Sequence, residues 1–285
     1  MKKIKLGIIG HGFVGQATDH GFSKVREKYI VDPRYGTTIE ELKKFQPDFI
    51  FICVPTPMKK DGSQDPSIVK NVFRELENNF KGIPKILKST ILPDLLIKLT
   101  KDQDSFVYNP EFLREKHANK DFINSPFVIL GGEKSTCKEV ELLYRNFSSC
   151  LTKKYLNVDI ETASLIKYSI NSFLATKVLF FNGIKDIFDE LDTKESWVDF
   201  INILSLDERI GDSHMSVPGH DGKRGFGGAC FTKDTAALIN YSDSISKKFE
   251  LLQTVVSLNN SLRKSYKNLD KREKDQNVNY DFSND

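Results

Sequence analysis

The chain has 285 residues, of which 39% are hydrophobic and 28% are charged. These values are ordinary for a globular protein and exclude collagen-like, disulfide-scaffold and wholly disordered chains. The net charge of +3, from 42 basic and 39 acidic residues, favours neither nucleic acid nor a membrane as a partner. At roughly 150 residues per domain, the length favours two domains.

The cysteines and the N-terminus indicate a reducing, cytoplasmic location. None of the four cysteines shows C-x-x-C or zinc spacing, so we expect free thiols and no metal site. No apolar run approaches the ~20 residues that cross a bilayer. The basic N-terminal tip is followed by an apolar run that a glycine pair interrupts, which fits a first strand better than a signal peptide.

The first half alternates short apolar runs with helical patterns, which predicts βαβ units around a parallel sheet. Strands are predicted at 5–9, 29–31, 48–54, 85–89, 106–108 and 127–130. Helices are predicted at 15–27, 39–45, 69–80 and 94–101. Residues 1–157 are therefore predicted to form an α/β domain with a Rossmann-like, doubly wound parallel sheet.

The second half, residues 158–262, is predicted to form an all-helical domain. Apolar residues recur every three or four positions across 159–191, which predicts one amphipathic helix about 45 Å long. On a monomer such a stripe would be a large exposed apolar surface, so we expect a homodimer formed through this domain. Further helices are predicted at 197–205, 235–241 and 249–262, and the polar residues 263–285 are expected to be disordered.

A G-x-G-x-x-G motif lies between the first predicted strand and the first predicted helix, the context in which it binds a dinucleotide. Gly10 permits the tight turn, Gly12 lets the backbone approach a diphosphate, and Gly15 allows the helix to pack closely. Phe13 and Val14 open the helix, whose N-terminal N–H groups would face the phosphates. A glycine turn without a ligand is the alternative.

Asp32 lies at the end of the next predicted strand, where an acidic residue binds the adenine ribose hydroxyls. A carboxylate there repels a 2′-phosphate, so the predicted cofactor is NAD rather than NADP. The neighbouring Arg34 weakens that preference slightly.

Lys167 and Asn171 are four residues apart in the predicted long helix and therefore lie on one face. Such a pair can hold a hydroxyl or carbonyl oxygen of a substrate. A solvated helix face is the alternative, and the spacing alone favours it.

The glycine-rich run 225–228 leads to Cys230, near the entry to a predicted helix. A helix N-terminus and the nearby Lys233 both favour the thiolate, and a cysteine is a strong nucleophile. Asp234 lies one helical turn further and can hold a water or a lysine near the sulfur. An inert buried cysteine is the alternative, and Cys53, inside a predicted strand, fits that description, as do the two cysteines without neighbouring motifs.

Together these motifs resemble the UDP-glucose/GDP-mannose dehydrogenase family. The runs 110–115 and 225–234 are the most specific matches. The other matches follow the family's order through most of the chain: 10–15 with Asp32, 54–57 with 61–62 and Asp65, 89–90, Asn109, Ala118 with Asp121, Glu161 with Lys167 and Asn171, 207–211, and 218–219.

The resemblance implies an NAD-dependent oxidation of a nucleotide sugar at C6, from alcohol to carboxylate, with UDP-glucose favoured. It implies that Cys230 attacks the intermediate aldehyde, while Lys167 and Asn171 stabilise the oxyanions. Asp234, with Thr90 and a water, would manage protons and hydrolysis. The resemblance also implies cofactor contacts from Thr56, Thr90 and Glu115, and substrate contacts from Glu111, Phe112, Leu113, Arg114, Gly227 and a partner subunit's copy of Arg209.

The sequence also departs from the family pattern. Thr232, Gly183 and Phe127 stand where a proline, a glutamate and an arginine are usual, and the segment 32–48 is short. A third domain, which helps to hold the nucleotide in the family, is expected to be absent. Lys223 and Arg224, placed before the glycines, are expected to supply diphosphate contacts instead.

Two alternatives remain open from the sequence. A β-hydroxyacid-type dehydrogenase also joins a Rossmann domain to a helical one, uses a Lys and an Asn four residues apart, and performs one hydride transfer without needing Cys230. A relative that binds NAD or a partner enzyme without turnover is the second alternative. The number of NADH molecules formed per substrate distinguishes them.

Overall fold

The computed structural model describes residues 3–77, 79–266 and 268–281, which fall into two compact units. The first unit comprises Met1–Thr56 and Asp65–Lys167, and the second comprises Pro57–Gln64 and Tyr168–Asp285. The long helix α7 (Ile160–Asp189) contributes residues to both units, so the division lies within this helix rather than before it.

The first unit is built on a seven-stranded sheet with the order β2-β1-β3-β4-β5-β6-β7. Neighbouring strands are parallel, except for the antiparallel pair β5 and β6. The order reverses at β1, and ligands bind at the carboxyl ends of the strands beside such a switch point. The strands are β1 (Lys5–Ile9), β2 (Glu27–Val31), β3 (Phe49–Ile52), β4 (Lys85–Leu87), β5 (Phe106–Tyr108), β6 (Val128–Gly132) and β7 (Tyr155–Val158).

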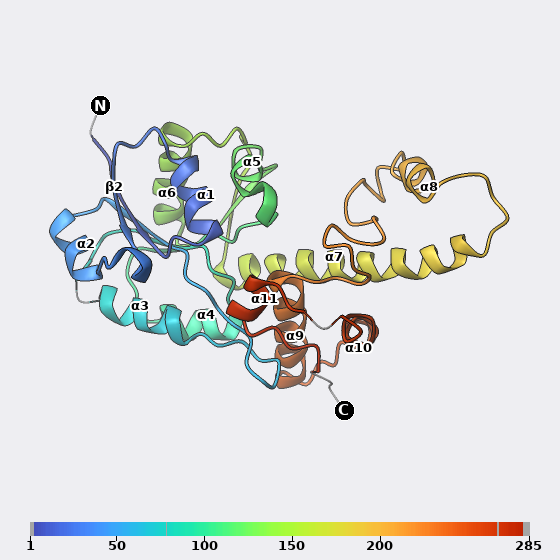
Figure 1. Cartoon of the computed structure of the whole chain (residues 1–285). Helices are drawn as coiled ribbons and strands as arrows, with labels where there is room; N and C mark the ends of the chain where they lie inside the picture. The colour runs from blue at the N-terminus through green and yellow to red at the C-terminus, as the bar shows by residue number, and fades with distance from the viewer. Residues whose placement is uncertain (1–2, 78, 267, 282–285) are drawn as a thin grey trace. The chain divides into compact units, whose positions relative to one another are not determined.

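Helices cover both faces of this sheet, as predicted for a doubly wound fold (Figure 1). Leu6 and Phe51 point to the face covered by α1 (Phe13–Gly21), α5 (Ala118–Ile123) and α6 (Lys134–Phe147). Ile9 and Ile52 point to the face covered by α2 (Ile39–Phe45), α3 (Ser67–Glu77) and α4 (Pro93–Thr100). Because both faces are buried, these strands read as continuous apolar runs, which is why the sequence predicts them.

The predicted bounds are confirmed for β1, β5 and α2, but one strand, two helices and two 3-10 turns of the first unit have no counterpart among the predicted elements. Strand β7 has no buried residue, so it lacks an apolar run. Helices α5 and α6 were missed although α6 buries Val140, Leu143 and Tyr144 at helical spacing. The two short 3-10 turns, η1 (Pro33–Tyr35) and η2 (Glu115–His117), carry no periodic pattern.

In the described part of the second unit the regular elements are helices, and an isolated bridge joins Met58 and Gln64. The predicted long helix is confirmed as α7, followed by α8 (Trp197–Leu204), α9 (Ala229–Ser244), α10 (Glu250–Arg263) and α11 (Lys271–Asp275). Helix α9 begins earlier than predicted, so that Cys230 lies in its first turn. Among the described helices, none combines the length and the apolar character that crossing a bilayer requires.

Much of the C-terminal segment is folded, contrary to the expected disorder. Helix α11 is capped by Asp270, and the side chains of Glu273, Val278 and Tyr280 are buried. Val278 and Tyr280 pack with Ala229, so the apolar partners of this polar segment come from a distant part of the chain. Residues 267 and 282–285 of the expected disordered segment lie outside the described residues.

Replacing Phe51 by alanine should destabilise the first unit by about 3–5 kcal/mol, because a fully buried aromatic ring leaves a cavity. The Phe51 ring lies 5.1 Å from the ring of Phe22 and is fully buried. Urea unfolding followed by circular dichroism measures this loss. The control Leu151→Ala, at a residue that is 68% exposed, should change stability by less than about 0.5 kcal/mol. Equal effects of the two variants would contradict this description of the core.

Candidate active site

The turn between β1 and α1 has the form that a diphosphate requires. Gly10 has a positive φ of 84°, and a Cβ on Gly15 would lie 2.0 Å from the carbonyl oxygen of Gly10. A Cβ on Gly12 would meet nothing within 4 Å, and Gly12 provides no side-chain cap for α1. Open space before an uncapped helix start suits a phosphate group, so the residues present fit a dinucleotide.

Asp32 is buried at the end of β2, beside this turn. Its carboxylate accepts hydrogen bonds from the His11 backbone N–H at 2.7 Å and from Arg34 Nε at 2.8 Å. The Arg34 side chain, helped by backbone N–H groups, holds the pKa of Asp32 well below its usual range although burial opposes this. Asp32 therefore stays ionised and able to accept hydrogen bonds from ribose hydroxyls, while Arg34 occupies part of the same carboxylate.

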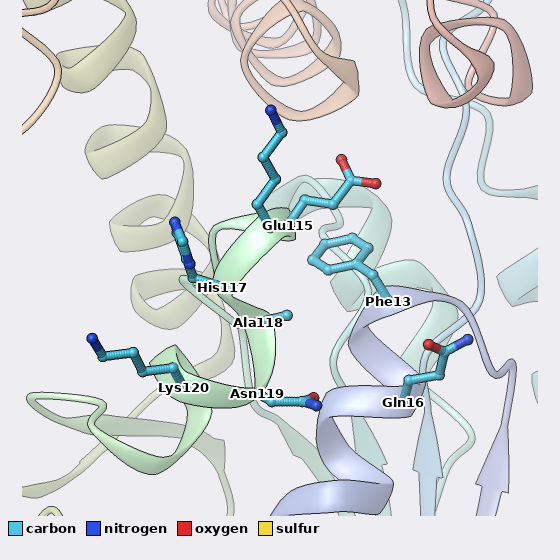
Figure 2. A pocket seen from close by; sticks show the side chains of 8 residues that line it. Phe13, Gln16, Glu115, His117, Ala118, Asn119 and Lys120 are labelled. Atoms are coloured by element: carbon cyan, nitrogen blue, oxygen red, sulfur yellow. The ribbon is translucent and has the colours of Figure 1, made fainter. Parts of the chain in front are cut away.

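A cavity of about 340 Å³ opens beside the start of α1. Figure 2 shows Phe13 and Gln16 on α1 facing residues of η2 and α5, among them Glu115 and Asn119. This volume lies within the range of small-molecule sites. The structure thus places two predicted cofactor contacts, Phe13 and Glu115, on the walls of one cavity, together with Val14 in the adjoining helix turn.

Two predicted cofactor contacts also meet at the carboxyl edge of the sheet. Thr56 follows β3 and Thr90 follows β4, and both are buried. The Thr56 hydroxyl donates to the carbonyl oxygen of Thr90 at 3.1 Å. In the same loop pair, the Ser89 hydroxyl donates to the carbonyl oxygen of Val54 at 2.6 Å. These bonds hold the two loops together at the edge where parallel sheets bind ligands.

Lys167 is buried, so the solvated alternative is wrong for this residue. Its ammonium donates to the Glu111 carbonyl oxygen at 2.5 Å and lies 3.5 Å from the Glu111 carboxylate. The Phe112 ring centroid is 5.2 Å away. The Glu111 carboxylate also accepts the Leu113 backbone N–H at 2.6 Å. The predicted substrate segment is therefore organised around a buried cation.

Arg114, another predicted substrate contact, is held by a carboxylate of its own unit. Its Nε and Nη2 atoms donate to the two carboxylate oxygens of Asp121 at 3.0 and 2.8 Å. This paired geometry orders the loop before α5. Because of these two hydrogen bonds, the Arg114 guanidinium is bound to the Asp121 carboxylate in this structure.

Cys230 lies in the first turn of α9, and its side chain is partly exposed. Gly228 begins the helix with a positive φ of 78° and no side-chain cap. One turn further, Asp234 is buried, with one oxygen bound by Asn171 at 2.6 Å and the other by Lys233 at 2.5 Å. The structure therefore brings Asn171 to Asp234 and fixes this carboxylate on both oxygens.

The glycines before Cys230 make room for a buried guanidinium. A Cβ on Gly227 would lie 1.8 Å from Arg263 Nη2, and a Cβ on Gly225 would lie 2.5 Å from the Asn259 side-chain oxygen. Gly225 also has a positive φ of 71°. The glycine requirement at these positions is thus explained by packing within the second unit.

The basic residues expected to contact a diphosphate are engaged elsewhere in the second unit. Arg224 lies 2.6 Å from the Asp186 carboxylate and donates to the Asn182 carbonyl oxygen at 2.8 Å. Lys223 donates to the Asn268 carbonyl oxygen at 2.8 Å. Their diphosphate role stays a prediction. Arg209, paired with Asp207 at 2.6 Å, has an 88% exposed side chain.

Both halves of the chain match one protein family. Residues 31–148 match the NAD binding domain of the UDP-glucose/GDP-mannose dehydrogenase family, and residues 161–261 match its central domain. The chain belongs to this family. The expected NAD cofactor and Rossmann-type fold are thereby confirmed.

Individual members of the dehydrogenase family are similar over most of this chain. UDP-glucose 6-dehydrogenase TuaD of Bacillus subtilis is 31% identical over 254 residues, which are 85% of this chain and 53% of the relative. A UDP-glucose 6-dehydrogenase of Rickettsia conorii is 34% identical over 223 residues, covering 74% of this chain and 49% of the relative. The chain thus spans about half the length of these relatives.

Solved structures share the fold of this family member. A UDP-glucose dehydrogenase from Pyrobaculum islandicum superposes with a TM-score of 0.73 at 24% identity, covering 91% of this chain and 68% of the other. The 3-hydroxyisobutyrate dehydrogenase of Mycobacterium tuberculosis has a TM-score of 0.72 at 13% identity, covering 94% and 97%. At these identities the likeness concerns the fold alone.

Within this family member, the other three cysteines are poor candidates for a nucleophile. Burial raises the pKa of Cys53 to about 12 and that of Cys137 to about 11. Burial also raises the pKa of Cys150. Thiols that resist ionisation are weak nucleophiles, which supports a structural role for all three.

Sequence reasoning missed Lys88, whose ammonium is buried after β4. It donates to the Asn109 side-chain oxygen at 3.0 Å, which also accepts the Tyr144 hydroxyl at 2.7 Å. Burial lowers the pKa of Lys88. A lysine directly following a buried strand was the available signal. Lys88 supports the backbone that begins the substrate segment at Asn109.

Two glycine variants separate cofactor binding from folding. Gly12→Ala should leave the melting temperature unchanged, because its Cβ meets open space, yet weaken NAD binding about tenfold or more, because it occupies the diphosphate's place. Gly15→Ala should cost about 2 kcal/mol or more in stability, because its Cβ collides with backbone. Calorimetric NAD titration and thermal melting measure the two effects. Wild-type NAD affinity in Gly12→Ala would contradict the assignment.

Proposed function

We propose that the protein oxidises a nucleotide sugar at C6, with UDP-glucose as the favoured substrate, from alcohol to carboxylate. The observation that carries this proposal is Cys230 in the first turn of α9, one turn before the buried carboxylate of Asp234. The names of the similar UDP-glucose 6-dehydrogenases support the choice of substrate.

Cys230 supplies the step that a simple alcohol dehydrogenase lacks. The β1–α1 turn and Asp32 would hold NAD, which would supply the hydride acceptor for each of the two oxidations. After the first oxidation, the Cys230 sulfur forms a bond to the aldehyde carbon, giving a thiohemiacetal. Loss of a hydride and a proton converts this adduct into a thioester. Water then adds to the thioester, the carbon–sulfur bond breaks, and the carboxylate and free thiol are released.

Fixed charges and hydrogen bonds of this chain support these steps. Lys167, buried and held by the Glu111 carbonyl oxygen, is a preorganised cation for an oxygen that becomes negative. Asn171 fixes Asp234 through a 2.6 Å hydrogen bond. We assign Asp234 the handling of the proton from the attacking water.

A single hydride transfer is the second candidate function. The likeness to 3-hydroxyisobutyrate dehydrogenase, which covers 97% of that chain, shows that a fold of this extent occurs in an enzyme of that name. In this case Lys167 and Asn171 would bind the reacting oxygen and Cys230 would have no chemical role. The yield of NADH per substrate distinguishes the two candidates.

We also propose that the protein acts as a homodimer in the cytoplasm. Phe173, Phe180 and Ile187 follow one another at seven-residue spacing on α7, with exposed fractions of 66, 61 and 63%. Apolar residues that recur every seven positions supply one of the two core positions in the seam of paired helices. A second copy would cover them, and it would offer its exposed Arg209 to the substrate. A reducing cytoplasm would keep Cys230 as a free thiol.

Incubation of the protein with NAD and UDP-glucose should yield two NADH per sugar, measured by absorbance, with UDP-glucuronate identified by mass spectrometry. Cys230→Ala should yield at most one NADH per sugar, because no thiohemiacetal can form. The control Cys150→Ala should keep two. One NADH per substrate in the wild type would support the second candidate, and no turnover with a panel of nucleotide sugars would overturn both.

Introducing charge into the exposed stripe, as Phe173→Glu with Phe180→Glu, should convert a dimer into a monomer, because two desolvated carboxylates would face the partner. Light scattering at micromolar concentration measures the mass. Leu251→Glu, at a 61% exposed position on α10, is the matched control and should leave the dimer intact. A monomeric wild type would contradict the proposed assembly.

A further inference from the structure

The C-terminal segment 268–281 binds the start of α9 through Glu273. The Glu273 carboxylate is 2% exposed and accepts the Gly228 backbone N–H at 3.0 Å and the Tyr280 hydroxyl at 2.7 Å. Its second oxygen accepts the Asp270 backbone N–H at 2.8 Å, which closes the capping box of α11. The segment is therefore attached to the residue that begins the Cys230 helix.

Further contacts give this attachment a defined register. Arg263 Nη2 lies 3.5 Å from Glu273 and 2.8 Å from Asp221, and the Arg263 side chain is 2% exposed. The Met58 backbone N–H donates to the Gln276 carbonyl oxygen at 2.9 Å. Ion pairs, main-chain hydrogen bonds and the packing of Tyr280 on Ala229 thus hold α11 in one position within the second unit.

In this position Arg272 reaches the sulfur of Cys230. Its Nη2 donates to Cys230 Sγ at 3.9 Å, at the long end of the range for hydrogen bonds to sulfur. A guanidinium remains charged at all accessible pH values, whereas a thiol ionises near neutrality when a cation lies beside it. The position of Cys230 in the first turn of α9 acts in the same direction.

In the part of the chain that the structure describes, several other charged groups near the start of α9 pair with one another. Lys233 and Asp234 form an ion pair at 2.5 Å on α9 itself. Arg263 of α10 is shared between Asp221 and Glu273. Lys59, Lys60 and Asp61, in the segment that contacts Gln276, are exposed. Arg272 donates a hydrogen bond to the sulfur, whereas the Lys233 ammonium lies against the Asp234 carboxylate.

We propose that Arg272, carried by the docked segment 268–281, stabilises the thiolate of Cys230 and so prepares it to attack the aldehyde. This inference rests on the proposed function, because it assigns a partner to the proposed nucleophile. On ionisation the thiol proton passes to water, and the guanidinium balances the negative charge on sulfur. When the sulfur adds to carbon, this charge moves to the aldehyde oxygen, and it returns to the sulfur beside Arg272 when the carbon–sulfur bond of the thioester breaks.

The test is the pH dependence of Cys230 alkylation by iodoacetamide in the full chain, which needs neither cofactor nor substrate. Peptide mass spectrometry separates Cys230 from the other three cysteines. In Arg272→Gln, the midpoint of the pH profile should rise by about one unit and alkylation at pH 7 should slow about tenfold. Arg272→Lys should recover part of this loss, because it restores the charge. Lys271→Gln and Lys274→Gln remove the same charge from exposed positions of α11 and should leave the profile unchanged.

An unchanged midpoint in Arg272→Gln would overturn the inference. Faster alkylation at pH 7 in this variant would also overturn it, because the segment would then only shield the sulfur. The inference and the proposed function fail separately. A shifted alkylation profile in a protein that yields one NADH per substrate would support the role of Arg272 and contradict the second oxidation. Two NADH per sugar with an unshifted alkylation profile would support the second oxidation and contradict the role of Arg272.

Discussion

The buried carboxylate of Glu273 is the group on which the candidate nucleophile of the second unit depends. A carboxylate in an apolar setting is costly unless its lone pairs are used, and here Gly228, Tyr280 and Arg263 surround it. Burial alone would raise its pKa, but these hydrogen bonds outweigh burial and the pKa of Glu273 is lowered. The ionised group therefore joins the glycine loop, helix α10 and the C-terminal segment.

The glycine loop takes its shape from the partner of this carboxylate. The Arg263 guanidinium fills the space that a side chain at position 227 would need, so a larger residue there would force this buried group to move. One buried ion pair thus explains a local sequence requirement, the start of α9 and the docking of α11. Removing either partner would leave the other charge buried without compensation, which strongly destabilises a folded protein.

In the first unit, the carboxyl edge of the parallel sheet positions the candidate binding groups. The strands end together, so that the glycine turn after β1, Asp32 after β2 and Thr56 after β3 share one edge. Lys167 lies buried against Glu111, in the segment that follows β5. Strand order rather than sequence distance brings these groups to one side of the sheet.

Local sequence patterns predict the α/β class, most strands, the long helix and the NAD cofactor. Those features rest on local periodicity and on short motifs such as Gly10 to Gly15, which a single stretch of chain contains. Tertiary structure alone decided that Lys167 is buried, that Asn171 binds Asp234, and that segment 268–281 is folded. Arg272 in a polar stretch carries no local signal, because its partner Cys230 is 42 residues away and only packing brings the two together.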